Sequence, residues 1–375
     1  MYTESEGIKP GENYQIWKTP KLTPENFFHL TQAQQLKYLV TCGQLAASSH
    51  NTQPWGIKIE PETNSFSIFL DKERVLPASD IDGRQACISI GCLITNMSIA
   101  TRYFGFTPKI DITEINPKSV KPKNTSQKFI PVANFYLLAE ASADNVDRAQ
   151  FEAIFTRRMN RGKYTGDFLM NRDLNLDLSQ ICTNNQVSLH TFSREDMRGR
   201  GAIRLIAEFQ AQADNYVVNN QGFSDELGRW FFPNDTKSPL GMPGDTFGLQ
   251  NEAAQRFAQG LLKEVELTAT EKAGLAVASK AGIESASVIG GITASKDQPF
   301  YWIKAGMALQ DIALTLEKNG LAMAVHAGLA EVSFVSRPLG LLLGTKEKLV
   351  TLFRTGKAEE TRPHSPRLPI EKVVL

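Results

Sequence analysis

The chain has 375 residues, a formal net charge of +1, 42% hydrophobic residues and 22% charged residues, values typical of a globular protein of one to three domains. The balanced charge gives no support for nucleic acid or a membrane surface as the main partner. No apolar run reaches the roughly 20 residues that span a bilayer, and the acidic N-terminus lacks a signal-peptide core, so we expect a cytoplasmic location.

The first clear element is a helix that begins after Thr31. Thr31 and Gln34 have the spacing of a capping box, in which a hydroxyl and an amide satisfy the first backbone N–H groups. Apolar residues then recur with helical spacing at Leu36, Leu39 and Val40. Residues 56–60 and 65–70 alternate between apolar and polar side chains around a turn, which predicts a β-hairpin.

A polar loop joins this helix to the hairpin and ends in Pro-Trp. Ser48 and Ser49 supply hydroxyls, and Asn51 and Gln53 supply amides, all able to donate and accept hydrogen bonds. This mixture suits the edge of a flat heteroaromatic ring, with Trp55 closing the pocket or anchoring the loop. The alternative is a well-capped loop with a buried Trp.

Two later segments, 88–106 and 303–321, resemble each other. Gly91 and Gly105 in the first match Gly306 and Gly320 in the second at the same offset of 215 residues, within one apolar register. The first glycine of each pair lies inside a helix and suggests close helix packing, and the second ends the helix. Chance resemblance is the alternative. A true repeat predicts two fused α+β halves, residues 1–143 and 144–375, that form an internal pseudo-dimer.

An arginine cluster opens the second half. Arg157, Arg158 and Arg161 follow an apolar helix end, and Ser365-Pro366-Arg367 stands near the C-terminus. Cations at a helix C-terminus are often solvated caps. The other interpretation is a phosphate site, because arginine binds phosphate oxygens in pairs.

Residues 222–248 are rich in aromatic residues, Pro and Gly and predict a long loop. Loops of this length are usually functional or disordered. We interpret this one as a lid over a pocket, and an arm on a partner subunit is the alternative. The four cysteines, Cys42, Cys87, Cys92 and Cys182, form no C-x-x-C pair and are expected to be buried thiols. The five histidines lack metal-ligand spacing, so no metal site is predicted.

Taken together, these motifs resemble the nitroreductase superfamily. Residues 48–55 are similar to its S-x-x-N-x-Q-P-W loop, and Arg157-Arg158-Met159-Asn160-Arg161 is similar to its R-R-S-x-R motif. Residues 306–320 resemble its central dimer helix, and 354–367 its C-terminal strand and phosphate-contacting Arg. The order of the two main motifs is reversed here and split between the halves. That arrangement resembles the two-domain subgroup that includes the dormancy-associated mycobacterial nitroreductase-like proteins.

The resemblance implies a nitroreductase-like fold present twice, with two antiparallel or mixed sheets flanked by helices around long central helices. It also implies one FMN per chain between the halves. Arg157, Arg161 and Arg367 would hold the phosphate with Arg158 nearby, and Ser48, Ser49, Asn51 and Gln53 would line the isoalloxazine edge. Met159 departs from the usual Ser and removes a hydroxyl contact. The second pseudo-equivalent site is expected to be empty, because neither half carries both motifs.

The implied activity is ping-pong hydride transfer from NAD(P)H through the flavin to a small nitro, quinone or enone acceptor, or flavin-dependent oxidation in a biosynthetic pathway. The flavin would carry the redox chemistry, so no side chain is nominated as catalytic. A non-catalytic protein that sequesters FMN under its lid is the second hypothesis, and a flavin-free scaffold is the third. The substrate, the choice of NADH or NADPH, and further homodimerisation stay open.

Overall fold

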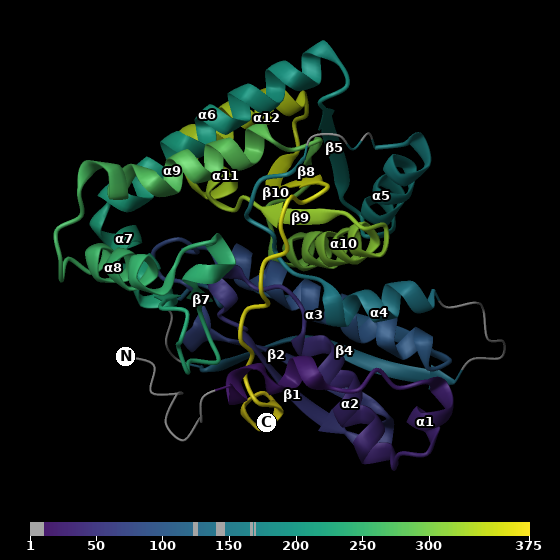
Figure 1. Cartoon of the computed structure of the whole chain (residues 1–375). Helices are drawn as coiled ribbons and strands as arrows, with labels where there is room; N and C mark the ends of the chain where they lie inside the picture. Colours follow the sequence, from purple (N-terminus) through teal and green to yellow (C-terminus); the bar gives the residue numbers. More distant parts are fainter. Residues whose placement is uncertain (1–10, 123–126, 140–146, 166–167, 169) are drawn as a thin grey trace.

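The computed structural model describes residues 11–122, 127–139, 147–165, 168 and 170–375. Two α+β bodies lie one above the other, and two long helices pack between them (Figure 1). These helices are α3 (Arg84–Tyr103) and α10 (Pro299–Lys318). The largest cluster of buried apolar side chains runs from the first body through both helices into the second.

The first body is built on an antiparallel sheet with the order β1-β2-β4-β3. Its strands are β1 (Trp55–Glu60), β2 (Ser65–Asp71), β3 (Phe106–Ile112) and β4 (Phe129–Ala139). Two helices precede them, α1 (Pro24–Phe28) and α2 (Gln32–Gln44).

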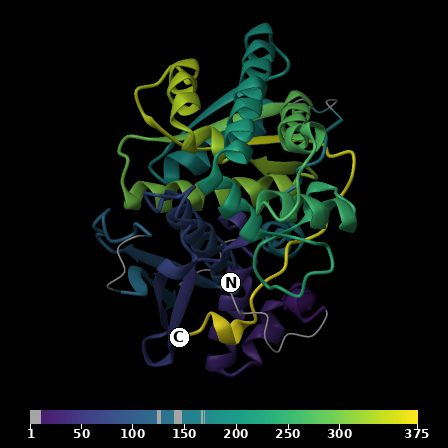
Figure 2. The same ribbon diagram turned by 90° about the vertical axis from the view of Figure 1, so that its left-hand side faces the viewer.

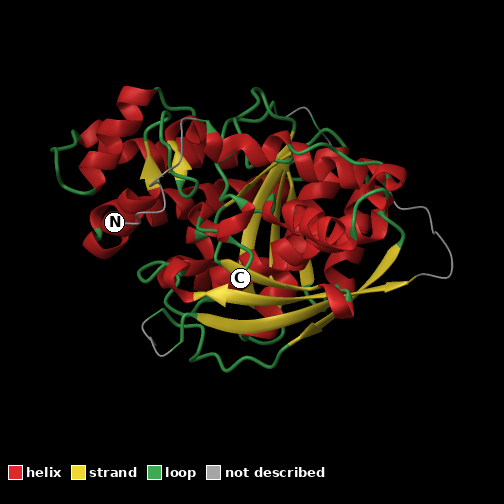
Figure 3. Cartoon of the chain, turned by 90° about the horizontal axis from the view of Figure 1, so that it is seen from below, coloured by secondary structure: helices red, strands yellow, loops and turns green. Residues whose placement is uncertain are grey.

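The second body is built on an antiparallel sheet with the order β5-β8-β10-β9. Its strands are β5 (Ser188–Ser193), β8 (Val288–Ala294), β9 (Ala322–Val325) and β10 (Lys348–Gly356). The helices around them are α4 (Arg148–Thr156), α5 (Arg172–Asn184), α11 (Gly328–Glu331) and α12 (Ser333–Leu343). Figure 3 shows the strands of the two sheets as separate groups.

The two sheets have the same topology when their strands are matched in chain order. In both bodies the first two strands pair with each other, a long helix follows the second, and the last two strands complete the sheet. The difference lies between the first two strands. A short turn joins β1 to β2, whereas four helices separate β5 from β8: α6 (Met197–Asn219), α7 (Gln221–Trp230), α8 (Asn251–Leu261) and α9 (Ala269–Glu284). This helical insertion gathers on one side of the molecule (Figures 1 and 2).

The close approach expected from the paired glycines is present where α3 crosses α10. A Cβ atom built on Gly91 would lie 2.1 Å from the carbonyl oxygen of Ile303, and one on Gly306 would lie 2.0 Å from that of Ile88. Only glycine allows the two backbones this approach. Gly105 and Gly320, which follow the two helices, have φ angles of +81° and +72°, as expected for left-handed caps.

The predicted helix and hairpin of the first body are confirmed. The side chain of Thr31 accepts from the Gln34 backbone N–H and the side chain of Gln34 accepts from the Thr31 N–H, which completes the capping box. Strands β1 and β2 pair from Trp55–Leu70 to Glu60–Ser65 around the predicted turn. The four cysteines are buried and free, as predicted.

The prediction of a long loop over residues 222–248 was wrong for its first part. Residues 221–230 form α7, which the Asn220 side chain caps by accepting from the Phe223 N–H. The helix exists because α8 covers its inner face: Gly228 packs against Leu261 and Leu262. After it come the two-residue strands β6 (Phe231–Phe232) and β7 (Met242–Pro243) and a 3-10 turn, η5 (Gly244–Phe247). We call residues 222–248 the lid segment.

The C-terminal tail runs from the second body back to the first. The backbone N–H of Ile57 in β1 donates to the Val373 carbonyl, and the Leu375 N–H donates to the Ile57 carbonyl, so the tail lies along the outer edge of the first sheet. Among the helices of the described residues, none is long and apolar enough to cross a bilayer.

Candidate functional site

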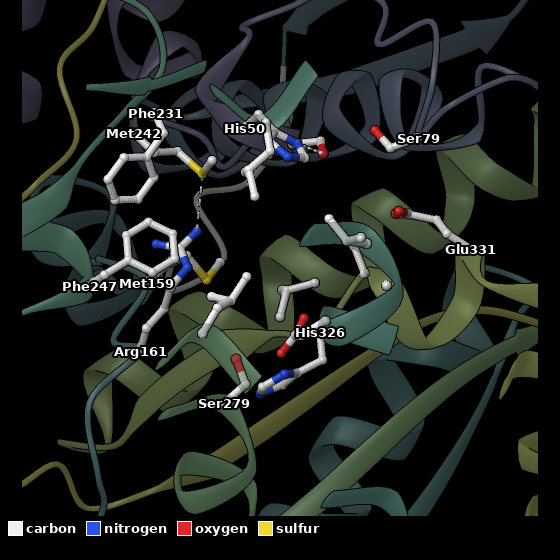
Figure 4. A pocket seen from close by; sticks show the side chains of 18 of the residues that line it. His50, Ser79, Met159, Arg161, Phe231, Met242, Phe247, Ser279, His326 and Glu331 are labelled. Carbon is white, nitrogen blue, oxygen red and sulfur yellow. Dashed lines mark hydrogen bonds between the residues drawn. The ribbon is translucent and has the colours of Figure 1, made fainter. Parts of the chain in front are cut away.

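A cavity of about 460 Å³ lies where the first body, the second body and the helical insertion meet. Its walls come from the loop after α2, from α3, from the helical insertion and from the segments around β9 and β10. Figure 4 shows the labelled side chains arranged around an open centre. The volume is within the range of small-molecule and cofactor sites.

The loop from Ser48 to Trp55 has an unusual backbone. His50, Asn51 and Gln53 have φ angles of +47°, +54° and +48°, a left-handed region that residues other than glycine seldom adopt. Each such residue costs on the order of 1–2 kcal/mol and persists only where its surroundings enforce it. The loop therefore needs strong tertiary contacts, and strain of this kind often accompanies a functional site.

The two amides of the loop supply these contacts. Asn51 donates to the carbonyls of Gly241 and Pro366, and Gln53 donates to that of Pro239 at 2.8 Å and accepts from the Leu368 N–H at 2.9 Å. Neither side chain lines the cavity; both hold the loop against the lid segment and the tail. Trp55 is fully buried at the start of β1, and likewise does not line the cavity.

Ser48, Ser49 and His50 do line the cavity. The Ser48 hydroxyl accepts from the Gln53 N–H, and the Ser49 hydroxyl donates to the side-chain oxygen of Gln85 on α3. His50 lies 3.2 Å from the Ser49 oxygen, and burial, with the nearby Arg161, lowers the pKa of its imidazole to about 4. A neutral imidazole and two hydroxyls thus give this wall hydrogen-bonding capacity without charge.

Arg161 is the member of the predicted arginine cluster that reaches the cavity (Figure 4). Its guanidinium stacks over the Phe247 ring at 4.4 Å and approaches the Met242 sulfur at 4.0 Å. Burial first, and then the charge of Arg354, lower its pKa to about 10. Two cations face the same space here, and no hydrogen bond of either goes to a carboxylate in the described part of the chain. Such a pair favours an anionic ligand. Met159 lies beside Arg161 on the wall.

The remaining predicted arginines lie outside the cavity lining. Arg157 donates to the Leu45 carbonyl, and its Nε is buried without a partner among the described residues. Arg158 donates to the carbonyls of Thr156 and Arg362. Arg367 donates to the carbonyls of Gln44 and Ala46 and to Asn51 Oδ1. Burial, together with Arg157, lowers its pKa to about 9. Arg157 and Arg367 together cap the C-terminal end of α2, next to the loop that it feeds.

A chain of polar side chains on the opposite wall has no counterpart in the sequence analysis. Arg354 Nε donates to His326 Nε2 at 3.1 Å, the other ring nitrogen of His326 lies 3.2 Å from Gln210 Oε1, and Gln210 Nε2 donates to Asp214 Oδ1 at 2.7 Å. All four residues line the cavity. They come from α6, β10 and the end of β9. The only signal in the sequence is the four-residue spacing of Gln210 and Asp214, which many surface helices share.

Acidic side chains lie at a further part of the wall. Glu226 on α7 accepts from the backbone N–H groups of Ala78 and Ser79 and from the Ser79 hydroxyl at 2.6 Å. Burial raises the pKa of Glu331 to about 8, and its Oε1 has no partner among the described residues. Figure 4 shows Ser79 and Glu331 across the cavity from Arg161. In the described residues, no group of three or more His, Cys, Asp and Glu side chains could hold a metal ion.

The lid segment forms much of the remaining wall. Five of its apolar side chains line the cavity: Phe223, Leu227, Phe231, Met242 and Phe247. Because its backbone also accepts the hydrogen bonds from Asn51 and Gln53, the segment is fixed directly to the loop that carries Ser48 and Ser49.

Sequence comparison relates this chain to mycobacterial proteins, although no protein-family profile matches it. It is 34% identical over 76 residues to the Mycobacterium tuberculosis protein named "Putative NAD(P)H nitroreductase acg", which is 20% of this chain and 22% of that protein. It is 30% identical over 128 residues to an uncharacterised protein of the same organism, 34% of each chain. The chain thus spans a fifth to a third of the length of these relatives. The matches support the relationship to the nitroreductase superfamily.

Solved structures named as nitroreductases are also similar. The FMN-dependent nitroreductase NfnB from Mycobacterium smegmatis in complex with NADPH aligns with a TM-score of 0.40 and 15% identity, over 62% of this chain and 99% of that one. A nitroreductase with bound FMN from Desulfitobacterium hafniense aligns with a TM-score of 0.37 and 11% identity, over 61% and 98%. Similarity of this extent transfers no residue role.

Proposed function

We propose that this chain, a relative of the nitroreductase superfamily, is an FMN-dependent oxidoreductase that passes electrons from NAD(P)H to a small acceptor. The observation that carries the proposal is a single cavity lined by Ser48, Ser49 and Arg161, a partly buried cation that has no carboxylate partner in the described part of the chain. The two motifs that the family resemblance singles out, distant in sequence, thus reach one cavity from different bodies. The named mycobacterial relatives support the same class of activity.

The residues present fit FMN. A phosphate needs unpaired N–H donors, and Arg354, which lines the cavity, has its Nη1 buried without a partner among the described residues. The isoalloxazine edge needs donors and acceptors, which Ser48, Ser49 and neutral His50 supply. The cavity volume is adequate for a cofactor.

We assign different parts to the predicted residues. Arg161, aided by Arg354, contacts the phosphate, because these two guanidinium groups line the cavity. Arg157 and Arg367 lie outside the cavity lining and donate to carbonyls at and just after the end of α2, so their first role is to fix the loop, with Arg158 next to Arg157 in the chain. Asn51 and Gln53 fix it from the other side. When bound, FMN supplies the two-electron chemistry of a ping-pong cycle.

We further propose that the chain is an internal duplication whose halves form the site that two subunits would otherwise share. The common strand order of the two sheets and the crossing of Gly91 and Gly306 support this. The helical insertion between β5 and β8 has no counterpart in the first half, which is consistent with a single functional site. Further homodimerisation is an independent question for light scattering.

A second candidate function is storage of FMN without turnover. The hydrogen bonds between the lid segment and the loop favour it, because they restrict access to the cavity. An anaerobic visible spectrum of the purified protein, before and after NADPH and then NADH, separates the candidates. A flavin band that a nicotinamide bleaches supports the oxidoreductase. A band that only dithionite bleaches supports storage, and no band even after addition of FMN refutes both.

A further inference from the structure

The cavity wall formed by α6 and α9 holds a carboxyl group with an unused oxygen. Asp214 on α6 lines the cavity and is only 9% exposed. Its Oδ2 makes no hydrogen bond of good geometry among the described residues, although the Ser279 hydroxyl on α9 lies close enough to the carboxyl group to stabilise its charged form. Buried polar atoms without a partner are uncommon and cost free energy, so each one in a cavity is a candidate ligand contact.

The other oxygen of Asp214 is held by a chain of groups whose donors and acceptors are all determined. Arg354 Nε can only donate, so His326 Nε2 accepts and its Nδ1 carries the proton. His326 Nδ1 therefore donates to Gln210 Oε1, which leaves the Gln210 NH₂ group to donate to Asp214 Oδ1. This chain fixes the carboxyl rotamer and leaves the proton of a neutral Asp214 on Oδ2, in a residue that lines the cavity.

The surroundings of Asp214 favour its neutral form. Burial raises the pKa of the carboxyl to about 7, although Ser279 on α9 and the Gln210 amide stabilise the charged form. The charged or titratable groups on neighbouring elements that line the same cavity are Glu226, Glu271, His326, Glu331 and Arg354. None of them shifts the pKa of Asp214 through its charge. A carboxylic acid kept neutral in this way can donate a hydrogen bond at neutral pH.

We propose that Asp214 binds the carbonyl oxygen of a neutral α,β-unsaturated ketone in this cavity and gives it a proton during reduction. The proposal rests on the proposed oxidoreductase function. When bound, reduced FMN would supply the hydride for the β-carbon. As the C=C electrons shift toward the carbonyl, the oxygen would take the Asp214 Oδ2 proton, which gives the enol. The enol tautomerises to the saturated ketone, and a proton from solvent restores the neutral carboxyl. Each turnover thus consumes one hydride and one proton.

The cavity near Asp214 favours a neutral ligand over an ion. Val217, Leu275 and Phe257 give it apolar walls. An anion would meet the carboxylate whenever Asp214 ionises, and a cation would meet the charges of Arg161 and Arg354. A ketone has the acceptor oxygen that the Oδ2 proton needs and carries no charge.

The test compares Asp214→Asn with Glu208→Gln, a matched change of carboxyl to amide at an exposed position of the same helix. FMN-loaded protein is reduced anaerobically with NADPH and then mixed with 2-cyclohexenone in a stopped-flow instrument between pH 5.5 and 8.5. In the wild type and Glu208→Gln, reoxidation slows as the pH rises through about 7, because the neutral carboxyl is consumed. In Asp214→Asn, reoxidation at pH 6 is at least tenfold slower and independent of pH, while reduction by NADPH and FMN content are unchanged.

Three outcomes overturn the proposal. In the first, Asp214→Asn is reoxidised at the wild-type rate and with the wild-type pH profile. In the second, both half-reactions of Asp214→Asn slow equally and FMN is lost, and in the third the reduced wild type does not react with 2-cyclohexenone. A readout without flavin separates these from failure of the proposed function. In flavin-free protein, the melting temperature of the wild type should fall relative to Asp214→Asn as the pH rises from about 4 to about 7, because only the folded state keeps the proton. A difference that does not change with pH refutes the neutral carboxyl. If the wild type binds no flavin, both the proton transfer and the proposed function are refuted, even where the melting temperatures of wild type and Asp214→Asn differ with pH as expected.

Discussion

The crossing of α3 and α10 allows a quantitative prediction for Gly91→Ala. In an ordinary helix interior this substitution would stabilise the protein by up to about 1 kcal/mol, because alanine has the higher helix propensity. Here the new methyl carbon would lie 2.1 Å from the Ile303 oxygen. Carbon–oxygen contacts are normally no shorter than about 3.3 Å, so the helices must separate by roughly 1 Å. The atom that it meets belongs to the backbone and cannot rotate away.

We expect Gly91→Ala to lower the free energy of unfolding by about 2–3 kcal/mol, the upper range for overpacking in a close-packed interior. The matched control is Gly201→Ala on α6, which is exposed and has nothing within 4 Å of its added Cβ; it should be neutral or slightly stabilising. Urea unfolding followed by circular dichroism, with the m-value checked in each variant, gives the comparison.

Adding Gly306→Ala should cost less in the Gly91→Ala background than alone, because the helices are already separated. FMN affinity should fall as well, since the cavity is built from both bodies. If Gly91→Ala behaves like Gly201→Ala, the two helices do not cross at this distance and the reasoning fails.

Three further predictions concern the site. Arg161→Gln should weaken FMN binding by about 10- to 100-fold in a fluorescence titration, the value of one charge-assisted hydrogen bond, with little change in melting temperature. Arg367→Gln should chiefly lower the melting temperature, because it leaves buried acceptors unpaired. Equal effects of the two substitutions on FMN affinity would contradict the assignment of Arg161 to the ligand and of Arg367 to the loop. His50 has a lowered pKa of about 4, so its contribution to the free energy of unfolding, at most about 3 kcal/mol, is complete above pH 6.5 and is lost as the pH falls toward 4. Substitution His50→Asn introduces a residue that tolerates positive φ and should flatten this part of a plot of melting temperature against pH. An unchanged plot would refute the lowered pKa of His50. Trypsin should cleave the exposed Lys237 in the lid segment more slowly when FMN is bound, while cleavage at exposed Lys296 is unaffected; equal protection of both would indicate a general change in stability and not a lid.

The features that could be predicted from the sequence depend on residues close together in the chain. The capping box at Thr31 and the hairpin of β1 and β2 involve neighbours within a few positions, so their patterns are visible in a single segment. The paired glycines were informative for a different reason. A glycine inside an apolar helix weakens that helix, and its presence in two helices at the same place in an apolar register indicated that both backbones needed the space.

The remaining features depend on partners that only the fold brings together. Helix α7 has its buried face because α8 covers it, and the Pro and Gly residues that follow made the whole segment look like a loop. Asn51 and Gln53 have the chemistry of ligand contacts, but the backbone of residues 239–241 and of the tail takes their hydrogen bonds. The chain from Arg354 to Asp214 joins residues from separate elements, and no local pattern marks it.

The place of the helical insertion has a consequence for protein engineering. Ser193 and Val288, the residues at its two ends, are paired neighbours across β5 and β8, so the insertion leaves and rejoins the sheet at a single point. The first body closes the same connection with the turn at residues 61–64. Residues 194–287 can therefore be exchanged for those of a relative that keep the apolar face of α6 against the sheet, without changing the strand register of the sheet. Helices α6, α7 and α9 supply a large part of the cavity wall. A library of such exchanges would vary that wall, provided that each keeps residues 239–241 and Phe247, which hold the loop of Ser48 and Ser49 and the side chain of Arg161.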